Sequence, residues 1–179
     1  GITLFDLLFG SGDDELTVNL PLPSPVEPAL PEAFRISGGA NGADKLEIIG
    51  TNNPNVLDVA IVGVLGSGAQ FQIGDIEILH MFGFAGPDQF TNNTAVPSFL
   101  VGGEGSDTLR GGSAVDIIFG GAGIDQLFGN DADDFLYPDH DIIGGQIVEQ
   151  IVNGDLANGG GGFDSVVALG FGDIVQAIN

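Results

Sequence analysis

Aliphatic residues recur at every ninth position in the second half of the chain. Four successive blocks of nine residues span 102–137, and the eighth residue of each block is aliphatic: Leu109, Ile118, Leu127 and Leu136. Side chains alternate across a strand, so the eighth residue faces one side while the seventh and ninth face the other. The pattern therefore predicts a short strand at the end of each block, with the eighth residue in a core.

The first six residues of each block are rich in glycine and end in an aspartate: Asp107, Asp116, Asp125 and Asp134. Glycine tolerates the positive φ that a tight reversal of the chain requires. Two blocks then make one coil of a parallel solenoid, in which block n stacks on block n+2 at about 4.8 Å. Asp107 and Asp125 are thus predicted to line one edge of the solenoid, and Asp116 and Asp134 the other.

Carboxylates stacked at this separation repel one another unless a hard cation lies between them. Calcium accepts about six to eight oxygen ligands and combines carboxylates with backbone carbonyls, such as those that glycine turns expose. Magnesium requires stricter octahedral geometry and keeps its waters. The blocks therefore predict Ca²⁺ between successive turns.

The pattern of the blocks, Gly-Gly-x-Gly-x-Asp-x-U-x with U the aliphatic eighth residue, resembles the RTX, or hemolysin-type calcium-binding, repeat family. The resemblance implies an all-β, right-handed parallel β-roll with several Ca²⁺ ions, each held by the sixth-position aspartates and the turn carbonyls of blocks n and n+2. The implied ligands are Gly102, Gly103, Gly105, Asp107, Gly111, Gly112, Asp116, Gly120, Gly121, Gly123, Asp125, Gly129 and Asp134. The edge of Asp116 and Asp134 departs from the pattern, because Ala114 and Ala132 replace the fourth-position glycine and Asn130 the second. An alanine there strains a left-handed backbone.

Weaker copies of the block lie on both sides of the strict array. They add to the predicted metal ligands Asp14, Asp44, Asp88 and Asp164. Residues 50–58 carry Asn55 where the acid should be. In residues 92–100 we expect Phe99 at the core position and Val101 as one inserted residue, so that Asp88 shares the edge of Asp107 and Asp125.

These copies predict one elongated domain. Its expected segments are a degenerate repeat (1–20), a proline-rich loop (21–36), wider coils of the same solenoid (37–100), the strict roll (101–137) and a C-terminal tail or cap (138–179). Apolar stretches predict longer strands within 56–65 and 71–84. Proline lacks the donor that a strand ladder needs, so the loop should leave the sheets. The chain opens on a strand-like sequence, and we expect it to be a fragment of a longer protein.

One outward face of the strict array is apolar or aromatic, with Ile117, Phe119, Phe135 and Tyr137 at its seventh and ninth positions. A patch of this kind marks a contact surface. Two interpretations remain open. Either the chain's own tail, 138–179, covers the patch, or the patch binds a second copy or another surface protein.

Charge supports the cation argument independently of the motif. Against 25 acidic residues there are three basic ones, and the formal net charge is −22. A chain that is 43% hydrophobic can still build a core, so we expect folding to be coupled to metal binding. The alternative, an acidic disordered segment, does not explain why the eighth residue of every nine-residue block is aliphatic. The chain has too few basic residues to bind nucleic acid or an anionic membrane surface. Its longest apolar run is too short for membrane insertion. It contains no cysteine, so disulfides cannot form.

Catalytic motifs are absent from the sequence: it contains no HExxH, GxSxG or GxxxxGK. His80 and His140 stand alone. We therefore predict not an enzyme but a noncatalytic calcium-binding module of a secreted or cell-surface bacterial protein, of adhesin, surface-layer or filament type. Two alternatives remain: the C-terminal type I secretion and folding domain of an exported hydrolase or toxin, and a lyase built directly on a β-helix. Upstream protease or lipase motifs would favour the first alternative, and turnover of acidic polysaccharides the second.

Overall fold

A computed structural model describes residues 4–19, 33–61, 71–150, 154–167 and 172–176. All regular elements in these ranges are strands. They are β1 (Leu4–Leu8), β2 (Glu15–Asn19), β3 (Ala33–Ser37), β4 (Lys45–Ile49), β5 (Val56–Ile61), β6 (Phe71–Gly74), β7 (Ile78–Ala85), β8 (Gln89–Asn93), β9 (Ser98–Glu104), β10 (Thr108–Arg110), β11 (Ile117–Ala122), β12 (Gln126–Asp131), β13 (Phe135–Tyr137), β14 (His140–Ile143), β15 (Gln146–Glu149), β16 (Leu156–Gly161), β17 (Ser165–Val166) and β18 (Ile174–Gln176). Among the described residues, no helix has the length and apolar character needed to cross a bilayer.

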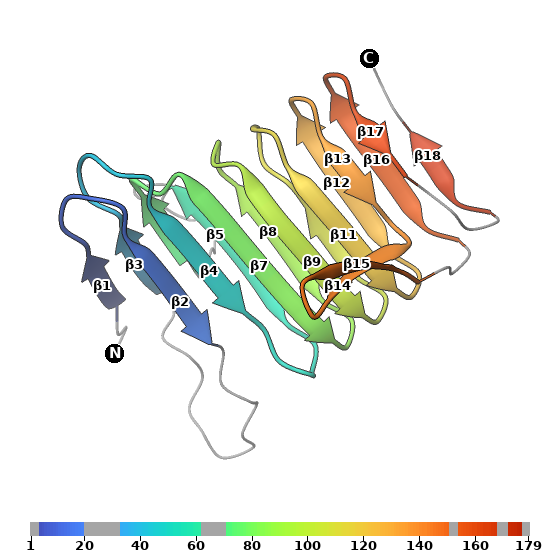
Figure 1. Ribbon diagram of the computed structural model, residues 1–179, viewed down its shortest axis with the longest axis horizontal. Coiled ribbons are helices and arrows are strands. Elements are labelled where there is room, and N and C mark those ends of the chain that lie inside the picture. The colour runs from blue at the N-terminus through green and yellow to red at the C-terminus, as the bar shows by residue number, and fades with distance from the viewer. Residues whose placement is uncertain (1–3, 20–32, 62–70, 151–153, 168–171, 177–179) are drawn as a thin grey trace.

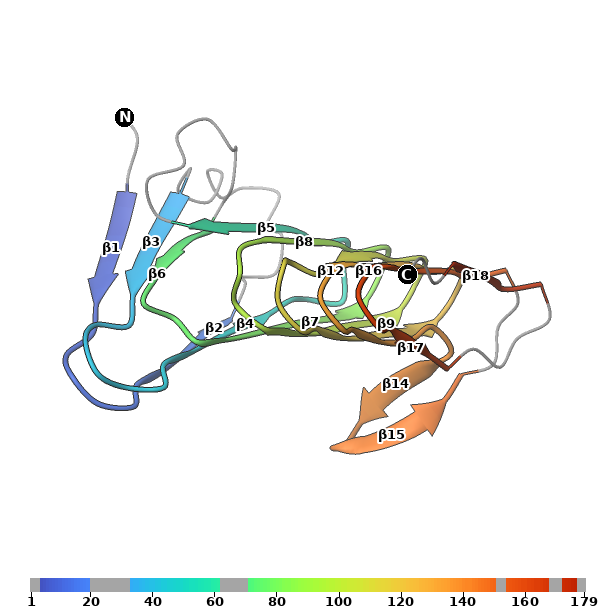
Figure 2. The same ribbon diagram turned by 90° about the horizontal axis from the view of Figure 1, so that it is seen from above.

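Two parallel sheets face each other along the molecule (Figures 1 and 2). The nine-stranded sheet has the order β1-β3-β6-β5-β8-β10-β12-β16-β18, and the seven-stranded sheet has the order β17-β13-β11-β9-β7-β4-β2. Within the strict array the chain passes from one sheet to the other with each strand. Leu109 pairs with Leu127 and Ile118 with Leu136, so equivalent residues of successive coils are eighteen apart. The predicted all-β parallel solenoid is confirmed.

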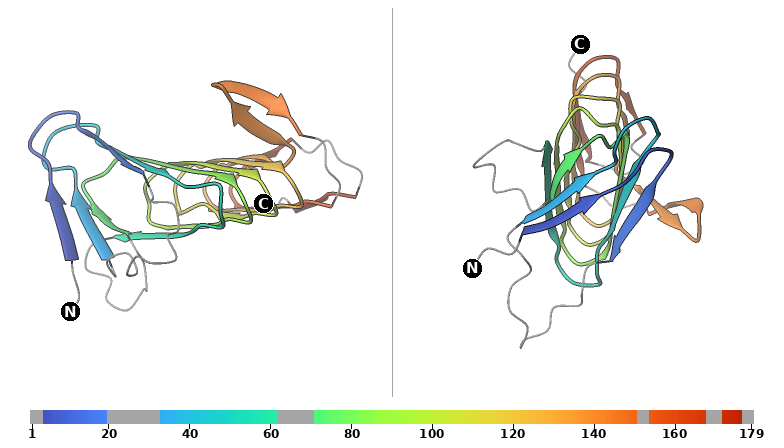
Figure 3. Two further views of the ribbon diagram at one scale, coloured as in Figure 1. Left: turned by 90° about the horizontal axis from the view of Figure 1, so that it is seen from below. Right: turned by 90° about the vertical axis from the view of Figure 1, so that its left-hand side faces the viewer.

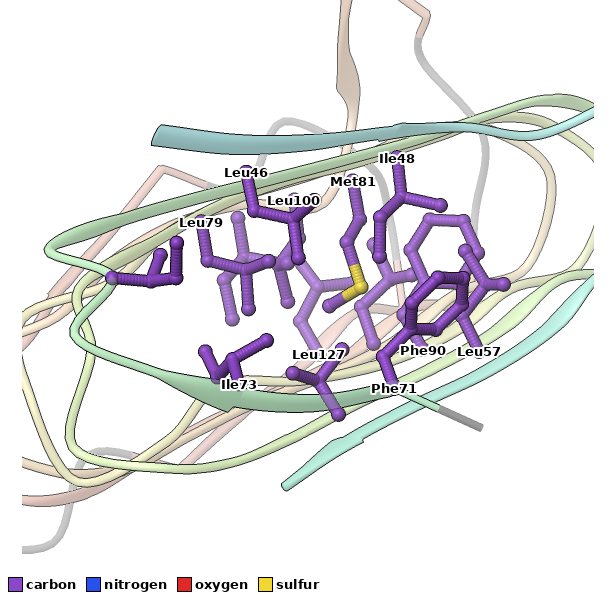
Figure 4. Close-up of a cluster of buried hydrophobic side chains, with 14 of the residues drawn as sticks. Leu46, Ile48, Leu57, Phe71, Ile73, Leu79, Met81, Phe90, Leu100 and Leu127 are labelled. Atoms are coloured by element: carbon purple, nitrogen blue, oxygen red, sulfur yellow. The ribbon is translucent and has the colours of Figure 1, made fainter. Parts of the chain in front are cut away.

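The core lies between the two sheets, and the eighth residues of the blocks fill it. Leu109, Ile118, Leu127 and Leu136 are each 0% exposed. The N-terminal coils add larger side chains such as Phe71, Met81 and Phe90 to the same cluster (Figure 4). Burying a side chain of this size contributes about 1.5–3 kcal/mol, so each coil is stabilised by contact with the next.

The N-terminal coils contain an additional strand between β4 and β7. β5 lies between β6 and β8 in the nine-stranded sheet, although β6 follows β5 in the sequence. In the opposite sheet β4 pairs directly with β7. The chain between β4 and β7 therefore contributes two strands, β5 and β6, to the nine-stranded sheet. The strand predicted over 71–84 is divided into β6 and β7 at Asp75, whose φ of 51° reverses the backbone. The domain boundaries predicted from the sequence stay a prediction, and the proline-rich segment falls on 20–32, outside the described residues.

The expected core position of Phe99 is wrong by one residue. Leu100 pairs with Ile118 and is fully buried, while Phe99 faces outward. Ser98 stands in the place of the sixth-position aspartate, since its backbone N–H and hydroxyl both donate to Asp116 Oδ1 at 2.7 Å. The additional residue therefore lies in the turn of 92–97 and not at Val101. Asn92 and Thr94 hydrogen-bond to each other within that turn and accommodate the extra length.

The C-terminal segment does not form a cap over its whole predicted range. The antiparallel hairpin β14–β15 leaves the solenoid and packs beside β9 and β11 (Figures 2 and 3). After it, β16 and β18 extend the nine-stranded sheet and β17 the seven-stranded sheet. The roll resumes because Asp155, Asp164 and Asp173 restore the nine-residue spacing.

Candidate metal centres

Turns that lead into the nine-stranded sheet form the first edge of the solenoid, and their aspartates stack in a ladder. In each step, the backbone N–H of one residue donates to Oδ1 of the equivalent aspartate one coil further on. The donor–acceptor pairs are Asn55–Asp88, Asp88–Asp107, Asp107–Asp125, Asp125–Asp155 and Asp155–Asp173, with N···O distances from 2.6 to 3.3 Å. The ladder brings together Asp88, Asp107 and Asp125 as the sequence predicts.

Turns that lead into the seven-stranded sheet form the second edge, which carries a similar ladder. Ser98 donates to Asp116, Asp116 to Asp134, and Asp134 to Asp164, at 2.7–3.0 Å. At the N-terminal end, Asp14 donates to Asp44 and Asp44 to Glu77. The structure therefore brings all the predicted aspartates into two rows, one on each edge.

One carboxylate oxygen of most ladder aspartates is buried without a partner. Within the described part of the chain, Oδ2 accepts no hydrogen bond in Asp14, Asp88, Asp107, Asp125, Asp134, Asp155 and Asp164. A buried, unpaired polar atom is costly. An ion that takes these oxygens as ligands would remove the cost. The unpaired carboxylate oxygens therefore fit a bound cation such as Ca²⁺.

Glycines at the first position of each block bring backbone carbonyls next to these oxygens. A Cβ added to Gly102 would collide with Asp107 Oδ2 and would lie 2.6 Å from the Gly120 carbonyl oxygen. A Cβ on Gly129 would collide with Asp134 Oδ2 and lie 2.5 Å from the Gly159 carbonyl. Each turn thus combines a carboxylate oxygen with a carbonyl of the next coil. All-oxygen donors of mixed type suit Ca²⁺.

Burial raises the pKa of the ladder carboxyls. It is the largest cause at Asp107, whose pKa rises to about 7, and at Asp125, whose pKa rises to about 8; neighbouring carboxylates add to both shifts. Burial likewise raises the pKa of Asp88 and Asp155 to about 6 and of Asp134 to about 7. The rows hold negative charge poorly by themselves, so they need protons or a cation.

The second edge departs from this geometry at one turn. Asp116 Oδ1 accepts from Ser98, and its Oδ2 accepts from the Gly112 backbone N–H at 2.6 Å. Burial still raises the pKa of Asp116. Both oxygens are thus satisfied by the protein, so Gly111, Gly112 and Asp116 fit an ion less well than the predicted ligands of the first edge.

Sequence reasoning missed three acidic residues that the structure brings together. Carboxylate oxygens of Asp139, Asp155 and Asp173 lie within 4.8 Å of one another. Asp155 and Asp173 are eighteen residues apart, with Asp164 halfway between them. The nine-residue period could have found both, but Ala157 stands at the core position after Asp155 and conceals the copy. Nothing in the motif signals Asp139.

The predicted partner surface is only partly a free surface. Phe119 is 3% exposed and stacks on Tyr137 with ring centroids 4.7 Å apart, and Tyr137 meets His140 of β14 edge-on. The hairpin therefore accounts for this half of the patch. Ile117 and Phe135 pair across β11 and β13 and remain 37% and 40% exposed. A partner-binding role stays a prediction for those two residues.

The chain matches the family model of the RTX calcium-binding nonapeptide repeat in four copies, over residues 99–127 and 110–139. This match confirms the predicted resemblance to the RTX calcium-binding repeat over residues 99–139, and calcium as the predicted cofactor. No curated protein and no solved structure matches the chain.

Proposed function

We propose, on the premise that residues 99–139 are RTX calcium-binding repeats, that this chain is a noncatalytic, calcium-stabilised structural module of a secreted or cell-surface bacterial protein. An adhesin, surface-layer or filament component is the type it fits best. One observation carries the proposal: buried aspartates stack along both edges with carboxylate oxygens that find no partner in the described ranges. These atoms are built into the frame of the solenoid itself, so calcium would stabilise the fold.

The residues that hold calcium would be the paired turns of the first edge. Gly102, Gly103, Gly105 and Asp107 would hold one ion together with the equivalent turn that ends at Asp125. Each ion would lower the repulsion between two stacked carboxylates and satisfy their unpaired oxygens. Metal binding would then contribute to folding directly, because the unfolded chain has no preformed site.

The proposed location is extracellular, where RTX repeats of bacterial secreted proteins are found. Extracellular calcium modules bind at about 10⁻⁴ to 10⁻³ M, a concentration reached outside the cell. The chain would remain loose before export and order afterwards. Because it has no cysteine, calcium would serve the stabilising role that disulfides have in many secreted domains.

Calcium titration of the purified chain tests the proposal. Circular dichroism should show a cooperative gain of β structure with Ca²⁺ after EDTA treatment, while equal concentrations of Mg²⁺ should give little. Equal β content in EDTA and in calcium would refute the proposal. Asp107→Asn should shift the midpoint to higher calcium, whereas Asp75→Asn, which changes an exposed acid by the same single charge, should leave it unchanged.

A further inference from the structure

The hairpin β14–β15 is inserted into a turn of the first edge. In the preceding coil that turn runs from Gly120 to Asp125. The Pro138 carbonyl lies beside Gly120, as the Gly120 carbonyl lies beside Gly102, and it accepts the Gly121 N–H at 3.1 Å. Pro138 therefore takes the place of the first-position glycine, and Asp139 takes the place of the second.

The insertion interrupts the turn after those two residues. After Asp139 the chain runs into the hairpin, which closes where the Gln150 N–H donates to the Asp139 carbonyl at 2.7 Å. The turn ends again at Gly154 and Asp155. Asp139 therefore lies both in the turn and at the base of the hairpin.

Asp139 brings a carboxylate to this turn. Its side chain is 0% exposed, and it shares the 4.8 Å cluster with Asp155 and Asp173. Asp155 is also 0% exposed, and its Oδ2 has no hydrogen-bond partner in the ranges that the structure describes. Three carboxylates this close, two of them fully buried, repel strongly unless a cation joins them.

We infer that Asp139, Asp155 and Asp173 form a further calcium-class site, in which a side chain at the base of the inserted hairpin joins two aspartates of the first-edge ladder. The inference rests on the proposed function, because it assumes that the roll takes up calcium at all. It differs from the sites of the strict first-edge turns in that Asp139 offers a side-chain carboxylate at the second position, where those turns have Gly103 and Gly121. The ion would tie the base of the hairpin to the last coils of the solenoid.

Such a tie would control the position of the whole hairpin. β14 packs beside β9 and β11, and His140 meets Tyr137, so hairpin and roll share a surface next to the site. Neutralising Asp139 at the hairpin base favours that packing. Calcium would thereby order both the roll and the element that covers Phe119.

Diffraction from wild-type crystals grown with Tb³⁺ in place of Ca²⁺ tests the site without any variant. An anomalous peak between the three carboxylates is the expected result. Peaks in the turns of Asp107 and Asp125 without one at Asp139 would overturn the inference and leave the proposed function intact. A map without peaks at any turn would overturn both.

A matched pair of variants tests the tie. Asp139→Asn should bind one calcium ion fewer than wild type by calorimetry. Its calcium affinity at this site should fall by at least the roughly 10–100-fold seen for groups that support a metal site. Amide exchange of residues 140–149 in calcium should become faster, with the protection of 102–137 retained. Glu149→Gln removes the same charge from an exposed position of the same hairpin and should change neither. If Asp139→Asn keeps the full number of ions and the protected hairpin, the inference is wrong.

Discussion

The two edges of the solenoid carry similar rows of aspartates on different backbones. On the first edge, positive φ is found at the second and fourth positions of both strict turns: Gly103, Gly105, Gly121 and Gly123. On the second edge, Asn130 and Ala132 of one turn also have positive φ. Gly112 and Ala114, at the same positions of the other turn, do not. In that last turn the Gly112 N–H points at Asp116 and occupies its second oxygen. The aspartate alone does not make a metal site; the turn conformation decides whether its second oxygen is left for a cation.

Withdrawal of calcium at different pH values should have the largest effect on the first edge. Burial and neighbouring carboxylates raise the pKa of Asp107 to about 7 and of Asp125 to about 8, above the ordinary value near 3.9 of an unfolded chain. The folded state then binds more protons than the unfolded state between about pH 4 and 8, so its stability falls as pH rises through that range. In EDTA, the β content measured by circular dichroism should therefore decrease from pH 5 to pH 8, because at low pH protons take the place of the cation.

Asp125→Asn serves as the control for this titration. It removes the group with the highest of these pKa values, so the β content in EDTA should depend less steeply on pH. A β content that rises with pH in EDTA would contradict the assignment of buried, proton-binding carboxyls to this edge.

Paired asparagine substitutions compare the edges directly. Asp125→Asn removes a charged ligand but keeps Oδ1 as the acceptor for Asp107, so calcium affinity should fall by at least the roughly 10–100-fold seen for supporting groups of metal sites. Asp116→Asn puts an amide donor against the Gly112 N–H, so it should destabilise the calcium-bound fold by about 1–3 kcal/mol. Calorimetric calcium titration and denaturant unfolding in saturating calcium measure the two quantities. Equal losses of affinity in both variants would remove the distinction between the edges.

Exchanges at the fourth position should have a smaller effect of opposite sign on the two edges. Gly123 has φ 151°, and a Cβ there would collide with the Gly105 carbonyl, so Gly123→Ala should destabilise the protein. Ala132 has φ 82°, and Ala132→Gly should relieve about 1–2 kcal/mol of left-handed strain, offset in part by the greater flexibility of glycine in the unfolded chain. Thermal unfolding in saturating calcium measures both. Stabilisation by Gly123→Ala would show that the first-edge turns are not built as described.

Much of the strict roll was predictable because a nine-residue period is a local property. Each block repeats the same turn and strand, so one aliphatic and one acidic position are enough to place residues in the core and on the edges. The core position of Phe99 is wrong because the extra residue of its coil lies in the turn before the strand, where Asn92 and Thr94 hydrogen-bond to each other. A sequence pattern does not show whether an inserted residue comes before or after a strand. Asp155 was missed because the small Ala157 follows it in the core position.

The sequence by itself determined the solenoid, its two rows of aspartates and the choice of calcium, because all three follow from the order of residue types along a regular repeat. The tertiary structure alone decided which carboxylate oxygens remain unpaired, that β5 and β6 lie side by side in one sheet, and that Asp139 meets Asp155 and Asp173. Those contacts join residues from separate coils and from an inserted hairpin. Their formation depends on how the chain returns after an interruption, and no local pattern records that path.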